Sequence, residues 1–112
     1  ALNQLYVKYE ANRQYDEVQA RKLMVDLTED YIKLVNASPA KKKIAGPVSE
    51  KNGDLVIVYV DKNDNNLGEV RTTKSEIIFK SANQEGNVIE SGRETYAEAY
   101  SKVYGKLPPA RV

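Results

Sequence analysis

One stretch of the chain is apolar at every consecutive position. It covers residues 55–60 and reads LVIVYV. Most of these side chains are β-branched, which favours an extended strand. Successive side chains of a strand point to opposite faces, so a strand that is apolar throughout needs cover on both faces. The pattern therefore predicts an interior strand, around which the rest of the chain is arranged.

Shorter strand-like segments surround this stretch and are separated by turn residues. They are residues 43–50, 67–73, 76–81 and 87–90. Asn52 and Gly53 favour a tight hairpin turn before the central strand, because both residue types tolerate positive φ. Pro47 places the first segment at a sheet edge, because proline donates no backbone hydrogen bond. Hairpin-length connections predict an antiparallel meander of four or five strands over residues 43–90.

The first third of the chain has the 3.6-residue period of a helix, over residues 2–36. The apolar residues that share one face of it are Leu2, Leu5, Tyr6, Tyr9, Ala20, Leu23, Met24, Leu27, Tyr31 and Leu34. Asp16 and Gln19 have the spacing of a capping box, in which each side chain satisfies a backbone donor at a helix start. An unbroken helix of this length would be longer than the domain. We therefore expect a long helix that either breaks near residues 13–16 or projects.

A shorter helix is predicted over residues 93–104. Ser91 and Glu94 have the capping-box spacing at its start, and Gly105 suits its end. Tyrosines at helical spacing share one face of it, namely Tyr96, Tyr100 and Tyr104. We expect this face to pack in the core, although a ligand-binding wall is the alternative.

Together these elements predict an α+β fold in one domain, residues 1–112. Helices from both ends of the chain pack on one face of a curved antiparallel sheet, and residues 106–112 form an extended tail because of Pro108 and Pro109. This layout is similar to that of cystatin-like and NTF2-like domains, and the long leading helix is similar to that of pilin-type subunits. Cystatin-type inhibition would require a recognisable inhibitory loop, and the sequence has none.

The composition excludes several kinds of chemistry. The chain has no cysteine and no histidine, so it offers no disulfide, no thiolate nucleophile and no soft or imidazole metal ligand. Its 17 basic and 16 acidic residues give a net charge of +1, which argues against a nucleic-acid partner. No apolar run is long enough to span a bilayer. The lack of cysteine favours an extracytoplasmic location, and the start at Ala1 rather than Met indicates a processed or trimmed piece.

Motifs that could carry catalysis or a metal have simpler explanations. Residues 61–69 alternate oxygen ligands, but Asn66 and Thr72 stand where an EF-hand requires Gly and Glu, so a polar hairpin turn is expected. Lys41, Lys42 and Lys43 suit a helix C-terminus and an edge strand. No serine elbow, phosphate loop or dinucleotide motif is present. We predict no catalytic residues, no cofactor and no metal, and therefore no enzyme.

A second apolar stripe on the first helix is the best candidate for a binding surface. Val18, Val25 and Ile32 follow one another at intervals of seven, with Tyr15 beside them, on the side away from the Leu/Tyr face. Either the C-terminal helix or residues 39–50 cover this stripe, or it contacts a protein partner or a second copy of the chain.

We therefore expect a non-catalytic binding or assembly module. The soluble part of a bacterial envelope or secretion complex, or a viral structural component, would fit this description. The alternative is a small-molecule-binding or catalytic pocket between the helix and the curved sheet.

Overall fold

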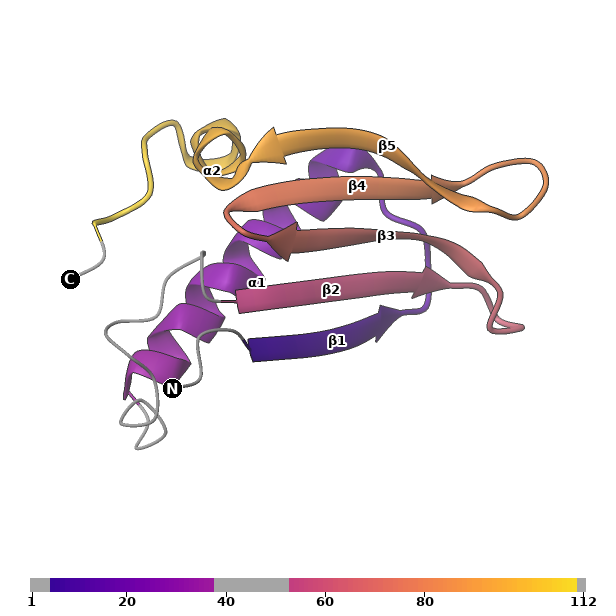
Figure 1. Ribbon diagram of the computed structural model, residues 1–112, viewed down its shortest axis with the longest axis horizontal. Coiled ribbons are helices and arrows are strands. Elements are labelled where there is room, and N and C mark those ends of the chain that lie inside the picture. The colour runs from indigo at the N-terminus through magenta and orange to yellow at the C-terminus, as the bar shows by residue number, and fades with distance from the viewer. Residues whose placement is uncertain (1–4, 38–52, 111–112) are drawn as a thin grey trace.

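The elements follow one another in the order β1, α1, β2, β3, β4, β5, α2 in a computed structural model that describes residues 5–37 and 53–110 (Figure 1). The strands are β1 (Leu5–Ala11), β2 (Gly53–Val60), β3 (Asn66–Thr73), β4 (Glu76–Ala82) and β5 (Val88–Thr95). The helices are α1 (Glu17–Ala37) and α2 (Tyr96–Tyr104). The predicted α+β layout is confirmed: a long helix, a mostly antiparallel sheet and a short C-terminal helix.

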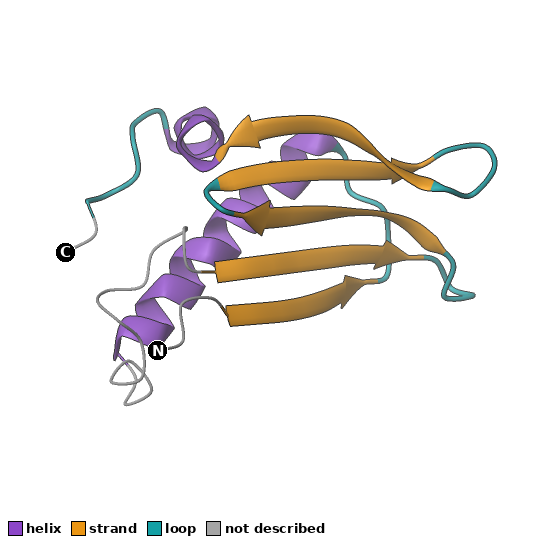
Figure 2. Cartoon of the chain, in the orientation of Figure 1, coloured by secondary structure: helices purple, strands orange, loops and turns teal. Residues whose placement is uncertain are grey.

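The strands form one sheet in the order β1-β2-β3-β4-β5 (Figure 2). From β2 to β5 the sheet is an antiparallel meander, and β2 is paired on both sides, as predicted for residues 55–60. The β1–β2 pair is parallel, with Val7 opposite Leu55, so the prediction of a wholly antiparallel sheet is wrong at this edge. The predicted strand 43–50 and the turn residue Asn52 lie outside the described residues.

The N-terminal helix is shorter than predicted. Residues 5–11 form β1 instead of continuing a helix, so the prediction of helix from residue 2 is wrong there. The predicted capping box is confirmed: the Gln19 amide donates to Asp16 Oδ1 at 2.7 Å, and the Asp16 amide donates to Gln19 Oε1 at 3.2 Å. These bonds satisfy donors that the first turn of α1 leaves unpaired. The Asp16–Gln19 capping box therefore marks the start of α1 after β1, and not a break within one long helix.

The second helix begins three residues later than predicted, because β5 continues to Thr95. Ser91 and Glu94 consequently lie in a strand, and the working capping box is formed by Thr95 and Glu98, in which each backbone amide donates to the other side chain at 3.1 Å. Gly105 ends α2 as predicted. Its φ of 72° is left-handed, which glycine adopts without strain, and its amide donates to the Ser101 carbonyl at 2.8 Å.

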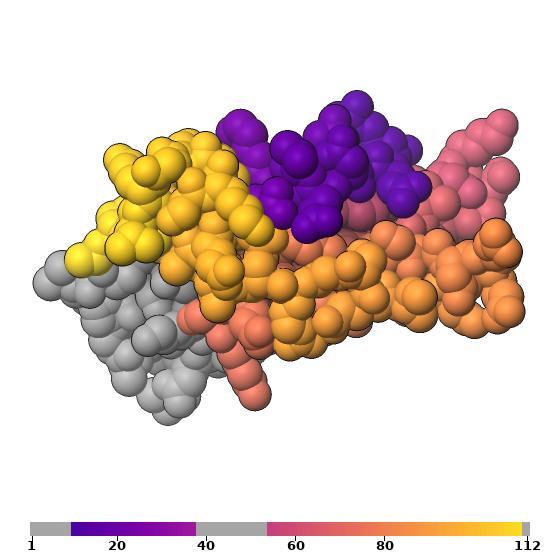
Figure 3. Space-filling view, turned by 90° about the horizontal axis from the view of Figure 1, so that it is seen from above, coloured from indigo at the N-terminus to yellow at the C-terminus, as the bar shows by residue number. Residues whose placement is uncertain are grey.

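The main core lies between the sheet and both helices, which share one face of the sheet (Figure 3). Its buried members are Ala20, Met24, Val25, Leu55, Ile57, Tyr59, Val70, Ile77, Phe79, Tyr96, Ala99 and Tyr100. Tyr96 and Tyr100 therefore belong to the core, as predicted, whereas Tyr104 is 45% exposed.

The opposite face of the sheet has a different composition. Three valines of β2 form a buried cluster there, Val56, Val58 and Val60. Next to them, Arg71 lies 4.0 Å from Asp54 and 3.7 Å from Glu69.

Candidate partner-binding site

The structure divides the predicted stripe on α1 into a buried part and an exposed part. Val25 is completely buried and Ile32 is 5% exposed, so the chain's own packing covers these two positions of the stripe. Val18 is 71% exposed. Tyr15 is half-buried and packs edge-on against Tyr59, with 5.5 Å between ring centroids. Of the predicted residues, only Val18 and Tyr15 therefore remain at the surface.

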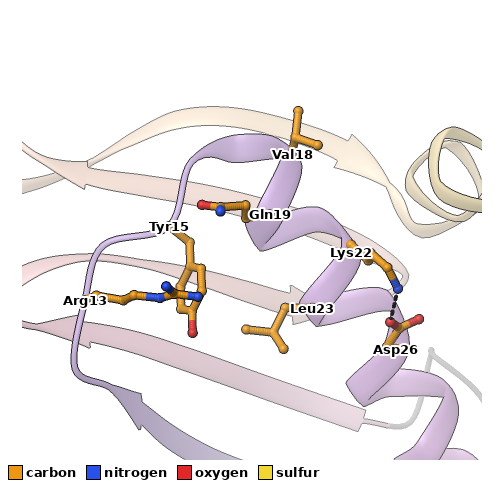
Figure 4. A pocket seen from close by; sticks show the side chains of 7 residues that line it. All are labelled: Arg13, Tyr15, Val18, Gln19, Lys22, Leu23 and Asp26. Atoms are coloured by element: carbon orange, nitrogen blue, oxygen red, sulfur yellow. Dashed lines mark hydrogen bonds and ion pairs between the residues drawn. The ribbon is translucent and has the colours of Figure 1, made fainter.

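A hollow with a volume of about 430 Å³ lies beside the first turns of α1. Its lining residues are Arg13, Tyr15, Val18, Gln19, Lys22, Leu23 and Asp26 (Figure 4). Figure 4 shows the side chains of Arg13 and Leu23 pointing toward Tyr15. The Arg13 guanidinium lies 4.8 Å from the centroid of the Tyr15 ring, a distance at which a cation is attracted by the ring face.

A second hollow of about 230 Å³ continues this surface between α1 and α2. Its lining residues are Val18, Arg21, Lys22, Lys102, Val103 and Tyr104. Because Val18 and Lys22 line both hollows, the two join into one surface. We call it the helix-layer surface and define it by Arg13, Tyr15, Val18, Lys22, Leu23, Lys102, Val103 and Tyr104.

A buried ion-pair network fixes the relative positions of α1, β5 and α2 below this surface. Arg21 of α1 donates to both carboxylate oxygens of Glu94, with Nη2 2.8 Å from Oε1 and Nε 3.1 Å from Oε2. The Glu94 side chain is 7% exposed, and Lys102 of α2 approaches it to 3.5 Å. The hydrogen bond to Glu94 raises the pKa of Arg21. Arg21 is thus held by Glu94. Of the rim cations, Lys102 pairs with Glu94 and Lys22 with Asp26, and Arg13 has no ion pair among the described residues.

A hydrogen bond at the centre of the surface connects the last turn of α2 to α1. The Tyr104 hydroxyl donates to Asp26 Oδ1, and Lys22 donates to Asp26 Oδ2 at 2.7 Å. The bond to Asp26 raises the pKa of Tyr104. Burial tends to raise the pKa of Asp26, but the hydrogen bonds from Lys22 and Tyr104 outweigh it and hold that pKa below its ordinary value.

A third hollow, of about 290 Å³, lies where α1 begins and includes Tyr15, Tyr59 and Phe79 in its lining. Burial raises the pKa of Tyr59 far above the usual range of a phenol, so its hydroxyl stays protonated. This aromatic hollow is the nearest feature to the alternative prediction of a pocket between helix and sheet.

The turn between β2 and β3 is the polar hairpin turn that was predicted. Asp61 Oδ1 accepts hydrogen bonds from the amides of Asn63 and Asn65, at 2.8 and 2.9 Å. The Asp61 carboxylate is therefore used for hydrogen bonds within the turn. Within residues 5–37 and 53–110, no three acidic side chains gather in a group that could hold a metal ion.

Sequence reasoning missed Leu23, Lys22, Val103 and Tyr104 as members of one surface. They come from two helices far apart in the chain, and only the packing of α2 beside α1 brings them together. Nothing in the sequence indicated that Leu23 is exposed, because it falls on the same apolar helical face as residues predicted to lie in the core.

Comparison of the chain with known protein families, with curated proteins and with solved structures finds no match. None of the helices in the described part of the chain is both long enough and apolar enough to cross a membrane.

Proposed function

We propose that the chain is a non-catalytic protein-binding module that contacts its partner through the helix-layer surface. The observation that carries this proposal is the exposure of Val18, 71%, at the point where two hollows meet. Leu23 and Tyr104 on either side are 36% and 45% exposed. Covering these apolar groups with a partner would stabilise the complex by roughly 25 cal/mol for each Å² removed from water.

The charges at the rim favour a partner segment that is both apolar and acidic. Arg13 has no ion-pair partner among the described residues, and the side chains of Lys22 and Lys102 are 63% and 52% exposed. Charged groups at a rim steer association and fix orientation more than they add affinity. An amphipathic helix with acidic residues beside its apolar face fits such a groove between two helices.

The filled interior makes a ligand pocket between α1 and the sheet a weaker candidate. Met24, Val25 and Val70 are completely buried where the helix meets the strands. A protein interior packed in this way has few voids larger than a water molecule. The hollows lie at the outer side and at the ends of α1, which suits contact with another polypeptide.

The test uses two positions on α1 that are equally exposed. Val18 and Leu34 are both 71% exposed, but only Val18 lines the hollows. A photo-reactive benzoylphenylalanine is placed at position 18 or at position 34 in the source cells, and cross-linked proteins are identified by mass spectrometry. We expect one defined partner from position 18 and none from position 34.

A charge reversal supplies the second arm. Lys22→Glu should reduce the cross-link from position 18, whereas Lys33→Glu on the same helix, outside these two hollows, should leave it unchanged. A cross-link to the chain itself, together with a dimer in sedimentation experiments, would identify the partner as a second copy. Equal labelling from positions 18 and 34 would contradict the proposal.

A further inference from the structure

The two edges of the sheet differ in how open they are to a further strand. The sheet ends at β1 on one side and at β5 on the other (Figure 1). An edge strand has backbone N–H and C=O groups that no neighbouring strand pairs, and a strand of another chain can pair with them. Each edge is therefore a site for strand addition, unless the edge strand itself prevents it.

The outer edge of β5 is irregular. Phe79 of β4 pairs with Gly92, and Lys80 pairs with Glu90. Ser91 is therefore an extra residue in the register, and its hydroxyl donates to the Phe79 carbonyl at 3.2 Å. A bulge of this kind bends and twists an edge strand, which hinders its pairing with another chain.

The outer edge of β1 is regular. Seven consecutive residues, Leu5–Ala11, pair with β2 without a shift in register. They include no proline and no glycine. Figure 2 shows β1 as the outermost strand, and no strand of the described residues pairs with its outer side. β1 is therefore the edge at which the sheet can continue.

The register of β1 separates its charged positions from its apolar positions. Lys8 lies opposite Val56 and Glu10 lies opposite Val58, on the face of the valine cluster. Positions 7, 9 and 11 carry Val, Tyr and Ala, and they lie opposite the core residues of β2. A strand added at this edge therefore meets two opposite charges on one face and apolar residues on the other.

A second copy of β1 matches this pattern in one antiparallel register. Opposed residues of two paired strands belong to the same face of the sheet, so a symmetric pair is centred on a residue. Centred on Tyr9, the pair places Lys8 of each copy opposite Glu10 of the other. Centred on Lys8 or on Glu10, it places like charges opposite each other, which is unfavourable. Charge complementarity thus selects both the occupant of the edge and its register.

We propose that two copies of the chain associate through the outer edges of β1, in an antiparallel pair centred on Tyr9. The result is a continuous sheet of ten strands, five from each copy. A two-fold axis perpendicular to the sheet relates the copies, so the pair of Lys8 with Glu10 forms twice and both helix layers lie on the same face. The proposal goes beyond the protein-binding function, because β1 contributes no residue to the helix-layer surface.

The experiment measures self-association of the chain by sedimentation equilibrium. We expect the native chain to form a dimer, and the amides of β1 to exchange more slowly at concentrations where the dimer forms. Lys8→Glu and Glu10→Lys should each weaken the dimer by roughly 10- to 100-fold, because both cross-strand pairs change from attraction to repulsion. Glu90→Lys makes the same charge change on β5 as Glu10→Lys makes on β1, and it should leave the dimer unchanged.

Two further samples separate the charge pairing from damage to the fold. The double variant Lys8→Glu/Glu10→Lys restores opposite charges in the same register and should dimerise as the native chain does. An equimolar mixture of the two single variants should form a heterodimer, because two carboxylates of one strand then lie opposite two ammonium groups of the other. Recovery of the dimer in the mixture shows that the single variants fold.

A native chain that remains monomeric at millimolar concentration overturns the proposal. A dimer that Lys8→Glu leaves intact, or one that slows exchange in β5 and not in β1, overturns it as well. Lys22→Glu on the helix-layer surface should leave the dimer unchanged, and Lys8→Glu should leave the cross-link from position 18 unchanged. The two proposals therefore fail independently.

Discussion

Ile57 and Val58 are neighbours in β2, yet they belong to two different buried clusters. Ile57 joins the core between the sheet and the two helices, where Met24, Val25 and Tyr96 also lie. Val58 belongs to the cluster of three valines on the opposite face, and no member of that cluster comes from α1 or α2. Both residues are nearly inaccessible, at 4% and 9% exposure. Neighbouring residues of β2 are therefore buried to a similar degree, one in a cluster with helix residues and the other in a cluster without them.

The two faces also differ in how they hold charge. On the helix-covered face, Arg21 and Glu94 share hydrogen bonds of 2.8 and 3.1 Å. On the other face, Arg71 Nε lies 3.7 Å from Glu69 Oε2, and neither atom makes a hydrogen bond. A charge pair contributes more when its hydrogen bonds are complete. We therefore expect the helix-covered face to account for most of the stability that single substitutions can remove.

The largest effect is expected for Val25→Asp. This substitution places a carboxylate at a completely buried position of α1, without a cationic partner. We expect a loss of about 3–5 kcal/mol in the free energy of unfolding, because an uncompensated buried charge is strongly unfavourable. Urea denaturation followed by circular dichroism measures it. Leu34→Asp on the same helix is the control, and a similar loss there would contradict the assignment of faces.

The second prediction compares the two neighbours directly. Ile57→Ala should cost about 2–5 kcal/mol, the usual range for emptying a core position. Val58→Ala removes one methylene fewer and should cost less, by about 0.8 kcal/mol or more. The difference is measured from paired denaturation curves. A larger loss for Val58→Ala would mean that the valine cluster, and not the helix-covered core, is the better packed face.

The third prediction concerns the two charge clusters. Glu94→Gln should cost about 1–3 kcal/mol, because Arg21 keeps its burial but loses the buried one of its two charged acceptors, with the exposed Glu17 remaining at 3.1 Å. Glu69→Gln should cost less than about 1 kcal/mol, since its pair with Arg71 lacks a hydrogen bond. Thermal denaturation of both variants gives the comparison. Equal losses would show that hydrogen bonding does not distinguish the two clusters.

The smallest effect is expected at Asp26, on the outer side of the helix layer. Its pKa is lower in the folded chain than its ordinary value of 3.8, so it stabilises the fold at neutral pH, and this contribution is lost as the pH falls through the lowered pKa. Asp26→Asn should therefore lower stability at pH 7 and cost less at pH 2. Denaturation curves at both pH values provide the measurement. A loss of the same size at both would exclude a contribution from the Asp26 charge.

The sequence predicted the meander and the helix ends better than the N-terminal segment. The central strand, the Asp16 capping box and the Gly105 end depend on residues close together in the chain, and all three are confirmed. Residues 5–11 fit two periods, because Leu5, Val7 and Tyr9 alternate while Leu5 and Tyr9 are also four residues apart. Pairing with β2 selects the strand, and that contact is distant in sequence.

The choice between the two apolar stripes of α1 also depended on distant contacts. Helical periodicity identifies the stripes but does not say which of them meets the sheet. The small side chain of Ala20 and the Thr28 hydroxyl, which donates to the Met24 carbonyl at 2.7 Å, suit close approach to the strands. The sheet therefore meets the side of α1 that carries Val25, and Leu34 of the predicted core face is 71% exposed.

The parallel pairing of β1 has a consequence for the order in which the chain folds. Each antiparallel pair from β2 to β5 joins strands that are consecutive in the chain, so closing it requires only a short loop. β1 reaches β2 only after α1 has crossed the sheet, and the loss of chain entropy for that step is larger. We expect the meander to gain amide protection first in pulsed hydrogen exchange and β1 to gain it last. During that interval the outer edge of β2 is an unpaired strand edge, open to another chain.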